Sequence, residues 1–505
     1  MSALFGDSPY LRQLEALVPA VFSCCRGEDE QRTLGSLSSE LAGVVPPPTI
    51  QRRDDLIDLA TAKTRDLLGR ETAELLRQSL EESFTALTAN HHAINTLPDF
   101  MQGSIVYALR KLSGGRENDG GAVPVFAAGG VPMSDFTYPC GILLARPRRS
   151  SSTAGARFML FKPKARKTLV IRQPGFTAAD LALARARASN GNWLWFEEKA
   201  LITIVDDILS LPSVLGQRLY SHQCTIINAT LWPRLFKPEV RVPRLVMLDK
   251  LALERDLLLA DLTNENSLAH AILFTPELRY AIARNLNGSR ACWACENVDL
   301  PSAPARGTLF FWGIDREGRM FPLNLDQKRN RLFAASDVSF SLDLTRDAVA
   351  DSLRENRILP GLFLGFAAMA LARGLLCCGG VFQAGYLRRM REMTALSLRE
   401  SGFSDMAACL EALPDAPFTS GFLPLGFRSG DSPPYAAGGI ELFASGGLSV
   451  KNLETLQSMS VAQALEPSFN YIYELAVPPG ERQPGWLEAV RPDYGVELSP
   501  WTPFR

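Results

Sequence analysis

The chain contains only four histidines, and two of them, His91 and His92, are adjacent. A neutral imidazole can donate or accept a proton near pH 7, which most other side chains cannot do without a large pKa shift. We therefore expect one of the two rings to be the general acid/base of an active site in residues 88–103. Polar side chains on both sides of the pair could orient the ring or bind a substrate; they are Thr88, Asn90, Asn95, Asp99 and Gln102.

Asn90 and Asp99 are the partners that we expect to orient the catalytic ring, while Thr88 and Gln102 would contact the substrate. Pro98 predicts a helix that begins at this point, and residues three apart, such as Asp99 and Gln102, share one face of a helix. The free N–H groups of that helix N-terminus would also suit an anion. A structural alternative stays open, in which both histidines only bond the backbone at helix ends. Because adjacent residues in an irregular loop point in different directions, at most one histidine would face a substrate.

A second candidate segment, residues 129–141 (GGVPMSDFTYPCG), directly follows a predicted strand at 123–128. In open α/β sheets, the loops after the carboxyl ends of strands line the ligand crevice. The segment is not a GxGxxG motif or a P-loop, and it could equally be an ordinary connection rich in turn residues. If it lines the crevice, it offers close backbone approach and hydrogen bonds to a substrate through Gly129, Gly130, Ser134 and Asp135.

A basic run, KPKARK at residues 162–167, follows a predicted strand at 158–161. Fixed cations neutralise phosphates in phosphoryl sites, so Lys162, Lys164 and Arg166 are candidates for binding an anionic substrate. The alternative is a solvated edge, where lysines also discourage aggregation of the sheet. The sequence favours the solvated edge.

Metal and redox chemistry have little support in the sequence. Cys292 and Cys295 form a C-x-x-C without a second pair, whereas a structural zinc site needs four ligands. We interpret these cysteines as ordinary thiols and predict no metal ligands; the cofactor stays unknown. Metal-dependent hydrolysis through His91, His92 and Asp99 is kept as a third hypothesis.

Composition excludes several other classes of function. The 505 residues carry 53 basic and 54 acidic side chains, a net charge of −1 that provides no long-range field for nucleic acid or an anionic membrane. The nine cysteines are few and odd in number, which indicates reduced thiols and a cytoplasmic location. The most apolar stretch, residues 359–378, has about a dozen apolar residues before Arg373, fewer than the roughly 20 of a membrane span. A buried Arg373 would need an anionic partner, either a carboxylate of the protein or a ligand.

The pattern of apolar residues indicates the elements that position these side chains. It predicts helices over 54–68, 72–87, 98–112, 359–376 and 382–397, and strands over 123–128, 142–145, 158–161, 168–172 and 244–248. Residues 308–325 read as a β-hairpin that turns at 315–318. Helices outnumber strands and separate the early ones, so we predict an α/β fold with a Rossmann-like, mixed or parallel sheet core and a mainly helical C-terminal region.

The expected organisation is an N-terminal helix and linker (1–50), an α/β core with the candidate site (51–340) and a mainly helical region (341–505). The function that these features favour is a soluble enzyme of small-molecule biosynthesis. It would catalyse group transfer or condensation on a polar or anionic substrate, possibly phosphorylated or a nucleotide, by histidine acid/base catalysis. A non-catalytic ligand-binding or scaffold protein is the alternative. We expect neither nucleic acid nor a membrane as partner.

Overall fold

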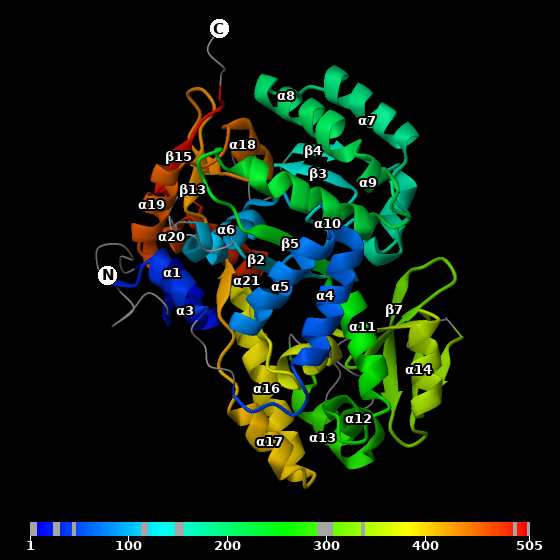
Figure 1. Ribbon diagram of the computed structural model, residues 1–505. Coiled ribbons are helices and arrows are strands. Elements are labelled where there is room, and N and C mark those ends of the chain that lie inside the picture. The colour runs from blue at the N-terminus through cyan, green and yellow to red at the C-terminus, as the bar shows by residue number, and fades with distance from the viewer. Residues whose placement is uncertain are drawn as a thin grey trace.

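The computed structural model describes residues 8–23, 31–42, 47–112, 120–146, 156–289, 307–334, 339–487 and 492–501 (Figure 1). Its centre is a five-stranded sheet in which all strands are parallel. In spatial order the strands are β12 (Phe418–Ser420), β11 (Leu376–Gly380), β1 (Thr85–Leu87), β2 (Ala122–Ala127) and β5 (Arg244–Asp249). The predicted α/β fold with a parallel sheet core is confirmed.

Helices cover both faces of this sheet, as a parallel sheet requires. One face packs against α6 (Pro98–Leu112) and α10 (Tyr220–Leu231), and the other against α4 (Asp54–Leu68), α5 (Arg70–Glu82) and α16 (Val381–Glu400). Successive residues of β2 therefore enter different cores, with Val125 in the first and Phe126 in the second. The strand is apolar throughout because neither of its faces meets water.

The other helices lie around these two layers. They are α1 (Pro9–Leu17), α2 (Pro19–Ser23), α3 (Leu34–Glu40), α7 (Ala178–Asn190), α8 (Trp195–Ile204), α9 (Pro212–Leu215), α11 (Lys250–Asp261), α12 (Leu268–Phe274), α13 (Pro276–Leu286), α14 (Arg346–Arg354), α15 (Leu362–Phe366), α17 (Ser404–Glu411), α18 (Gly439–Ala444), α19 (Val450–Ser458), α20 (Val461–Leu465) and α21 (Phe469–Ala476).

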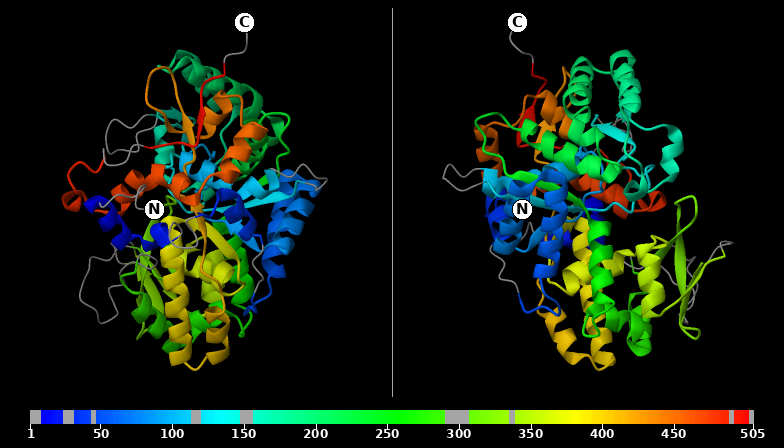
Figure 2. Two further views of the ribbon diagram at one scale, coloured as in Figure 1. Left: turned by 90° about the vertical axis from the view of Figure 1, so that its left-hand side faces the viewer. Right: turned by 45° about the vertical axis from the view of Figure 1, so that its right-hand side comes forward.

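Three further sheets flank the core (Figure 2). The largest is antiparallel, in the order β10 (Ile358–Pro360), β6 (Phe311–Ile314), β7 (Met320–Asp326), β8 (Arg331–Ala334) and β9 (Ser341–Asp343). The others are β14 (Tyr435–Ala436), β13 (Leu425–Phe427) and β15 (Val496–Leu498), and the pair β3 (Gly141–Leu144) and β4 (Ala156–Met159).

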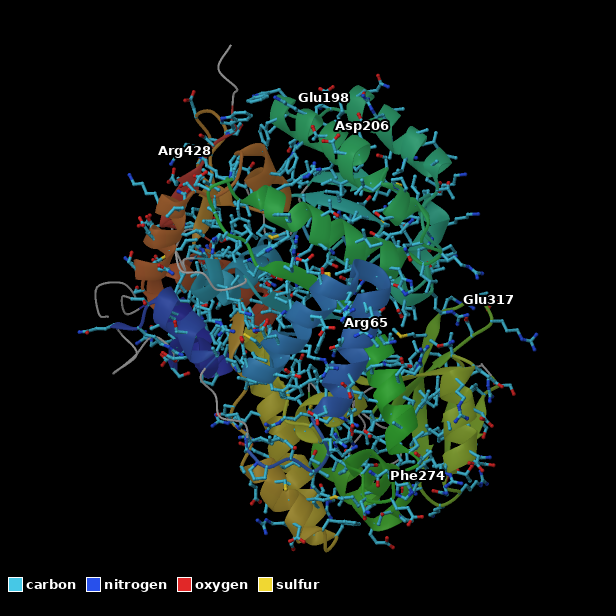
Figure 3. The ribbon with its side chains drawn as sticks, viewed as in Figure 1. Arg65, Glu198, Asp206, Phe274, Glu317 and Arg428 are labelled. Atoms are coloured by element: carbon cyan, nitrogen blue, oxygen red, sulfur yellow. The ribbon has the colours of Figure 1, made fainter. Side chains whose placement is uncertain are left out.

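The predicted β-hairpin is formed by β6 and β7. Its tip is held by Arg319, which bonds Asp315 at 2.6 Å and Glu317 at 3.3 Å. The Glu317 side chain projects from the edge of the molecule, as do those of Arg428 and Glu198 elsewhere on the surface (Figure 3). The charges of this turn thus form a solvated hairpin tip.

Two strands of the central sheet, β1 and β11, begin where the sequence predicted helices. The helix expected over 72–87 ends at Glu82, and its last three residues form the central strand β1. The helix expected over 359–376 is instead the short β10 and α15, a π-helical turn (Ala367–Leu371) and the start of β11. A short apolar run suits a buried strand as well as a buried helix, so periodicity alone cannot distinguish them. Among the described helices, none is both long and apolar enough to cross a bilayer.

A third difference concerns residues 168–172, predicted as a strand. Residues 170–172 form a 3-10 helix, and only Leu169 makes a β-bridge, to Pro132. The central sheet contains strands from both sides of the domain boundary predicted at residue 341. β11 and β12 lie beyond that residue, yet they pair in the same sheet as β1, β2 and β5. Regions 51–340 and 341–505 therefore share one core, and their division into domains stays a prediction.

Candidate functional site

The two candidate segments meet at the carboxyl edge of the parallel sheet. Residues 88–92 leave β1 between its two neighbours: the Thr88 N–H donates to Cys378 O at 2.9 Å, and the His92 N–H to Ala128 O at 3.0 Å. The chain passes from β1 to α6 on one face and from β11 to α16 on the other, so strands β1 and β11 flank a topological switch point. Ligands of open α/β sheets bind at such points.

His91 is held by a carboxylate from the neighbouring loop, 129–141. Its Nδ1 lies 2.8 Å from Asp135 Oδ1 and 3.3 Å from the Thr137 hydroxyl. Thr137 in turn donates to the same Asp135 oxygen, from its hydroxyl at 2.7 Å and from its N–H at 3.0 Å. Thr137 therefore holds the Asp135 carboxylate in the position from which it orients the imidazole. The predicted orienting partners were Asn90 and Asp99, and Asp135 occupies that position instead.

The other nitrogen of His91 is left for a partner from outside the protein. No described residue bonds Nε2, and the side chain is 22% exposed. Phe100 and Phe136 lie beside the ring, each with its centroid 5.6 Å away. Phe136 is itself 44% exposed, so an apolar surface adjoins the free nitrogen.

Asp135 is ionised in this arrangement. Burial by itself would raise the pKa of Asp135, but hydrogen bonds from His91 and Thr137 outweigh it and hold the pKa below its usual value. An ionised carboxylate on Nδ1 favours the tautomer with the proton on that nitrogen. Nε2 then carries a lone pair, as a general base needs.

His92 points in a different direction from His91, as expected for adjacent loop residues. It is fully buried, and its Nε2 lies 2.8 Å from the carbonyl oxygen of Ser221 in α10. Its Nδ1 is buried without a hydrogen-bond partner among the described residues. His91 is therefore the candidate acid/base, and His92 belongs to the interior beneath it.

Asp249, the last residue of β5, lies against Gly129. Its Oδ1 accepts hydrogen bonds from the N–H groups of Leu251 and Ala252 and so caps α11. Its Oδ2 would be 2.1 Å from a Cβ on Gly129, so only glycine leaves room for this carboxylate. Asp249 is not among the candidates predicted from the sequence, although its position between the predicted strand at 244–248 and the helix α11 is typical of a capping residue.

Asp99 and Asn90 lie near the pair formed by His91 and Asp135 without bonding to it. Asp99 Oδ2 accepts a hydrogen bond of 2.7 Å from the Ser420 hydroxyl at the end of β12. Burial raises the pKa of Asp99 and outweighs that bond and one from the Gly421 N–H. Asn90 is buried, and its Nδ2 has no partner among the described residues.

Thr88 and Gln102 have partners within the protein. The Thr88 hydroxyl accepts a 2.6 Å hydrogen bond from Gln383 in the first turn of α16. Gln102 is fully buried and bonds only backbone: its Nε2 donates to Leu425 O and Ala437 O, and its Oε1 accepts from Leu425 N–H. Gln102 therefore joins α6 to β13 through bonds within the protein, and its predicted contact with a substrate stays a prediction.

The remaining candidates are surface residues. Lys162, Lys164 and Arg166 are exposed along a 3-10 helix (Pro163–Lys167), in agreement with a solvated basic run. Ser134 is exposed in the 129–141 loop. Cys292 and Cys295 lie outside the described residues.

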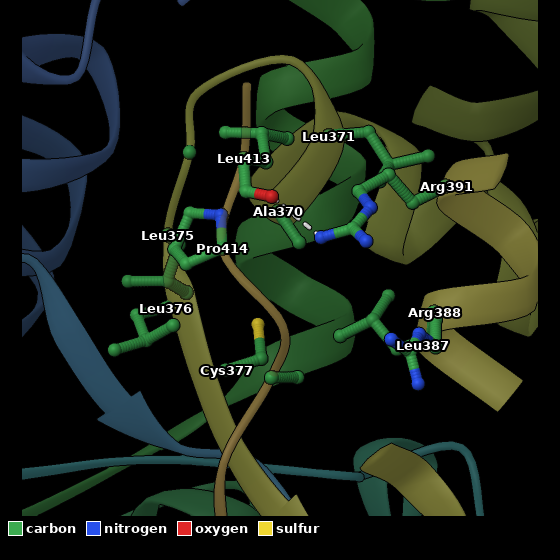
Figure 4. Close-up of a pocket in the computed structure, with 12 residues that line it drawn as sticks. Ala370, Leu371, Leu375, Leu376, Cys377, Leu387, Arg388, Arg391, Leu413 and Pro414 are labelled. Atoms are coloured by element: carbon green, nitrogen blue, oxygen red, sulfur yellow. Dashed lines mark hydrogen bonds between the residues drawn. The ribbon is translucent and has the colours of Figure 1, made fainter. Parts of the chain in front are cut away.

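Arg373 and a nearby pocket belong to the opposite, amino-terminal end of the sheet. Arg373 is buried and bonds both carboxylate oxygens of Asp261, at 2.7 and 3.0 Å, so its anionic partner is a side chain of the protein. The pocket lies where β11 begins and is mostly apolar, with Cys377 on its wall and Arg391 donating to Leu413 O across it (Figure 4). Neither feature adjoins His91.

No group of three or more His, Cys, Asp or Glu side chains in the described part of the chain could hold a metal ion. His91, His92 and Asp99, the ligands of the metal hypothesis, each have a separate partner. No family model matches the chain, and neither curated proteins nor solved structures include a significant match.

Proposed function

We propose that this protein is an enzyme in which His91 is the general acid/base and Asp135 its orienting partner. The observation that carries the proposal is the 2.8 Å contact between Nδ1 of His91 and the ionised Asp135, combined with a partly exposed ring whose Nε2 has no partner among the described residues.

The chemistry that this pair supports is proton transfer during group transfer or condensation. Nε2 takes a proton from a hydroxyl or amine nucleophile of the substrate as the new bond forms. The resulting imidazolium is stabilised by Asp135, and it returns the proton to the leaving group. Asp135 holds the tautomer throughout and does not itself take up the proton.

Two features of the site support a small substrate with an apolar part and an anionic or polarised oxygen. Phe136 offers an exposed ring beside the catalytic nitrogen. No described residue accepts a hydrogen bond from the N–H of Gly129 or Gly130, and unpaired N–H groups are the usual donors to a developing oxyanion. The anionic part of this substrate would be a phosphate group, as in a phosphorylated compound or a nucleotide.

The experiment is an untargeted turnover assay with low-molecular-mass extract of the cells that make the protein. Mass spectrometry before and after incubation shows which compounds the protein consumes and forms. We expect wild-type protein and His270→Gln to change the same compounds, because His270 lies on α12 and its ring makes an edge-to-face contact with Phe274. His91→Gln and Asp135→Asn should lower these changes by about 10²–10⁴-fold.

Equal turnover by wild-type protein and His91→Gln would refute the proposed base. If wild-type protein changes no compound, while one is retained on it during gel filtration, the non-catalytic binding protein becomes the better interpretation.

A further inference from the structure

Two buried hydrogen-bond acceptors, His92 Nδ1 and Asp249 Oδ2, lie near the pair of His91 and Asp135, since His92 adjoins His91 and Asp249 lies against Gly129, where the loop that carries Asp135 begins. The Nε2 of His92 contacts a carbonyl oxygen, Ser221 O, which can only accept. Nε2 therefore carries the proton, and Nδ1 of the neutral ring is an acceptor. Asp249 Oδ2 is the second acceptor. Neither atom has a hydrogen-bond partner among the described residues.

These two groups interact electrostatically, and no hydrogen bond joins them. His92 is the strongest influence that lowers the pKa of Asp249, whose net shift is upward because burial dominates. Backbone geometry agrees, since His92 bonds Ala128 and the Asp249 carboxylate lies against the next residue, Gly129. His222, next to Ser221, is the third member of the group and also interacts with both.

An ionised Asp249 would have no described lysine or arginine beside it to balance its charge. Asp249 Oδ1 is occupied by the N–H groups of α11, and no Lys or Arg of the described residues forms an ion pair with the carboxylate. The nearest basic residues are engaged elsewhere: Lys250 pairs with Glu254 and Lys63 with Asp256. A buried carboxylate is normally paired with a cation that also donates hydrogen bonds.

We propose that His92 Nδ1 and Asp249 Oδ2 together bind the primary ammonium group of a small-molecule substrate. An ammonium carries three donors and one positive charge, so it satisfies both acceptors and balances Asp249. A divalent metal fits less well, because no three ligands of the described residues converge. The inference rests on the proposed function for its biological meaning, since the amine would anchor a substrate whose reacting part lies at His91, one residue away.

The test uses [15N]histidine NMR, which is simple here because the chain has four histidines. Single His→Gln variants assign the imidazole signals. Methylammonium chloride is the probe, and a Kd of about 1–10 mM is expected for so small a ligand. We expect the His92 Nδ1 signal to shift saturably and the His270 signals to stay in place. Potassium and tetramethylammonium, which lack N–H donors, should produce no shift at equal ionic strength.

Two variants of Asp249 keep the cap of α11 while changing the second oxygen. Asn and Ser are both good capping residues, so Asp249→Asn and Asp249→Ser should fold. Each should lose the response to methylammonium, whereas Asp256→Asn, a matched change on α11, should retain it. The proposal is overturned if potassium shifts His92 equally, if methylammonium gives no saturable shift, or if Asp249→Asn still responds.

This outcome is independent of the turnover assay. A saturable shift together with equal turnover by His91→Gln would keep the amine site and reject the proposed base. The absence of a shift together with loss of turnover in His91→Gln would keep the base and reject the amine.

Discussion

The carboxylate of Asp135 lies 2.8 Å from Nδ1 of His91, although 44 residues separate the two in the chain. The two side chains follow neighbouring parallel strands, β1 and β2, which run in the same direction and end at the same edge of the sheet. The contact is thus a consequence of the sheet order.

Asp135→Asn should reduce stability at neutral pH and much less in acid. The folded pKa of Asp135 lies below its usual value, because bonds from His91 and Thr137 outweigh burial. Such a carboxyl stabilises the fold above its unfolded pKa of about 3.9, and the contribution is lost as the pH falls through the folded pKa. We expect a loss of about 1–2 kcal/mol at neutral pH, measured by urea unfolding. A difference that stays constant down to about pH 3 would contradict this explanation.

Gly129→Ala should be far more disruptive than Gly130→Ala. A Cβ on Gly129 would lie 2.1 Å from Asp249 Oδ2, whereas on Gly130 the nearest atom is Leu251 Cδ2 at 3.2 Å. Overpacking of this kind costs about 1–3 kcal/mol. Thermal or urea unfolding of both variants measures the difference. Asp249→Ser, which removes the obstructing oxygen, should recover part of the loss in a double variant, and strictly additive effects would argue against the contact.

Gln102→Met should destabilise the protein by about 3 kcal/mol, because it leaves the Leu425 N–H and the Ala437 carbonyl oxygen buried without the bonds from Gln102. Leu425 O keeps its bond from the Ala437 N–H. Gln217→Met is the matched control, since Gln217 is only half-buried and its side chain makes one exposed bond, to Ser213 O. Urea unfolding of both variants provides the comparison. If Gln102→Met instead keeps its stability and loses only turnover, Gln102 is a substrate contact after all.

Asp261→Ala should cost about 3–5 kcal/mol, since it leaves the buried Arg373 guanidinium without its bidentate partner. Asp351→Ala breaks the exposed pair with Arg354, at 2.8 Å, and should cost less than about 1 kcal/mol. Chemical unfolding distinguishes the two. Equal losses in the two variants would mean that burial does not determine the strength of the Arg373 pair.

Local sequence patterns predicted the elements whose ends carry strong signals. Helices α4 and α6 begin and end at the residues expected, because Gly69 stops the first and Pro98 starts the second. The hairpin β6–β7 was equally clear, since its turn requires a glycine at Gly318, where φ is +82°. Strands β1, β11 and β12 were missed. They have three to five residues each, too few to show a period, and their partners are distant in the chain.

In the candidate site, too, local patterns indicated some features and only long-range contacts determined the others. Residue types and spacing, by themselves, selected the pair His91 and His92 and the loop that begins at Gly129, because imidazoles beside polar groups and a glycine pair after a strand are local features. Only the tertiary structure decided that Asp135 orients His91, that His92 turns inward and that Asp249 lies beneath Gly129. These pairings depend on the order of parallel strands, which is determined by long-range packing of both faces of the sheet and leaves no local trace in the sequence.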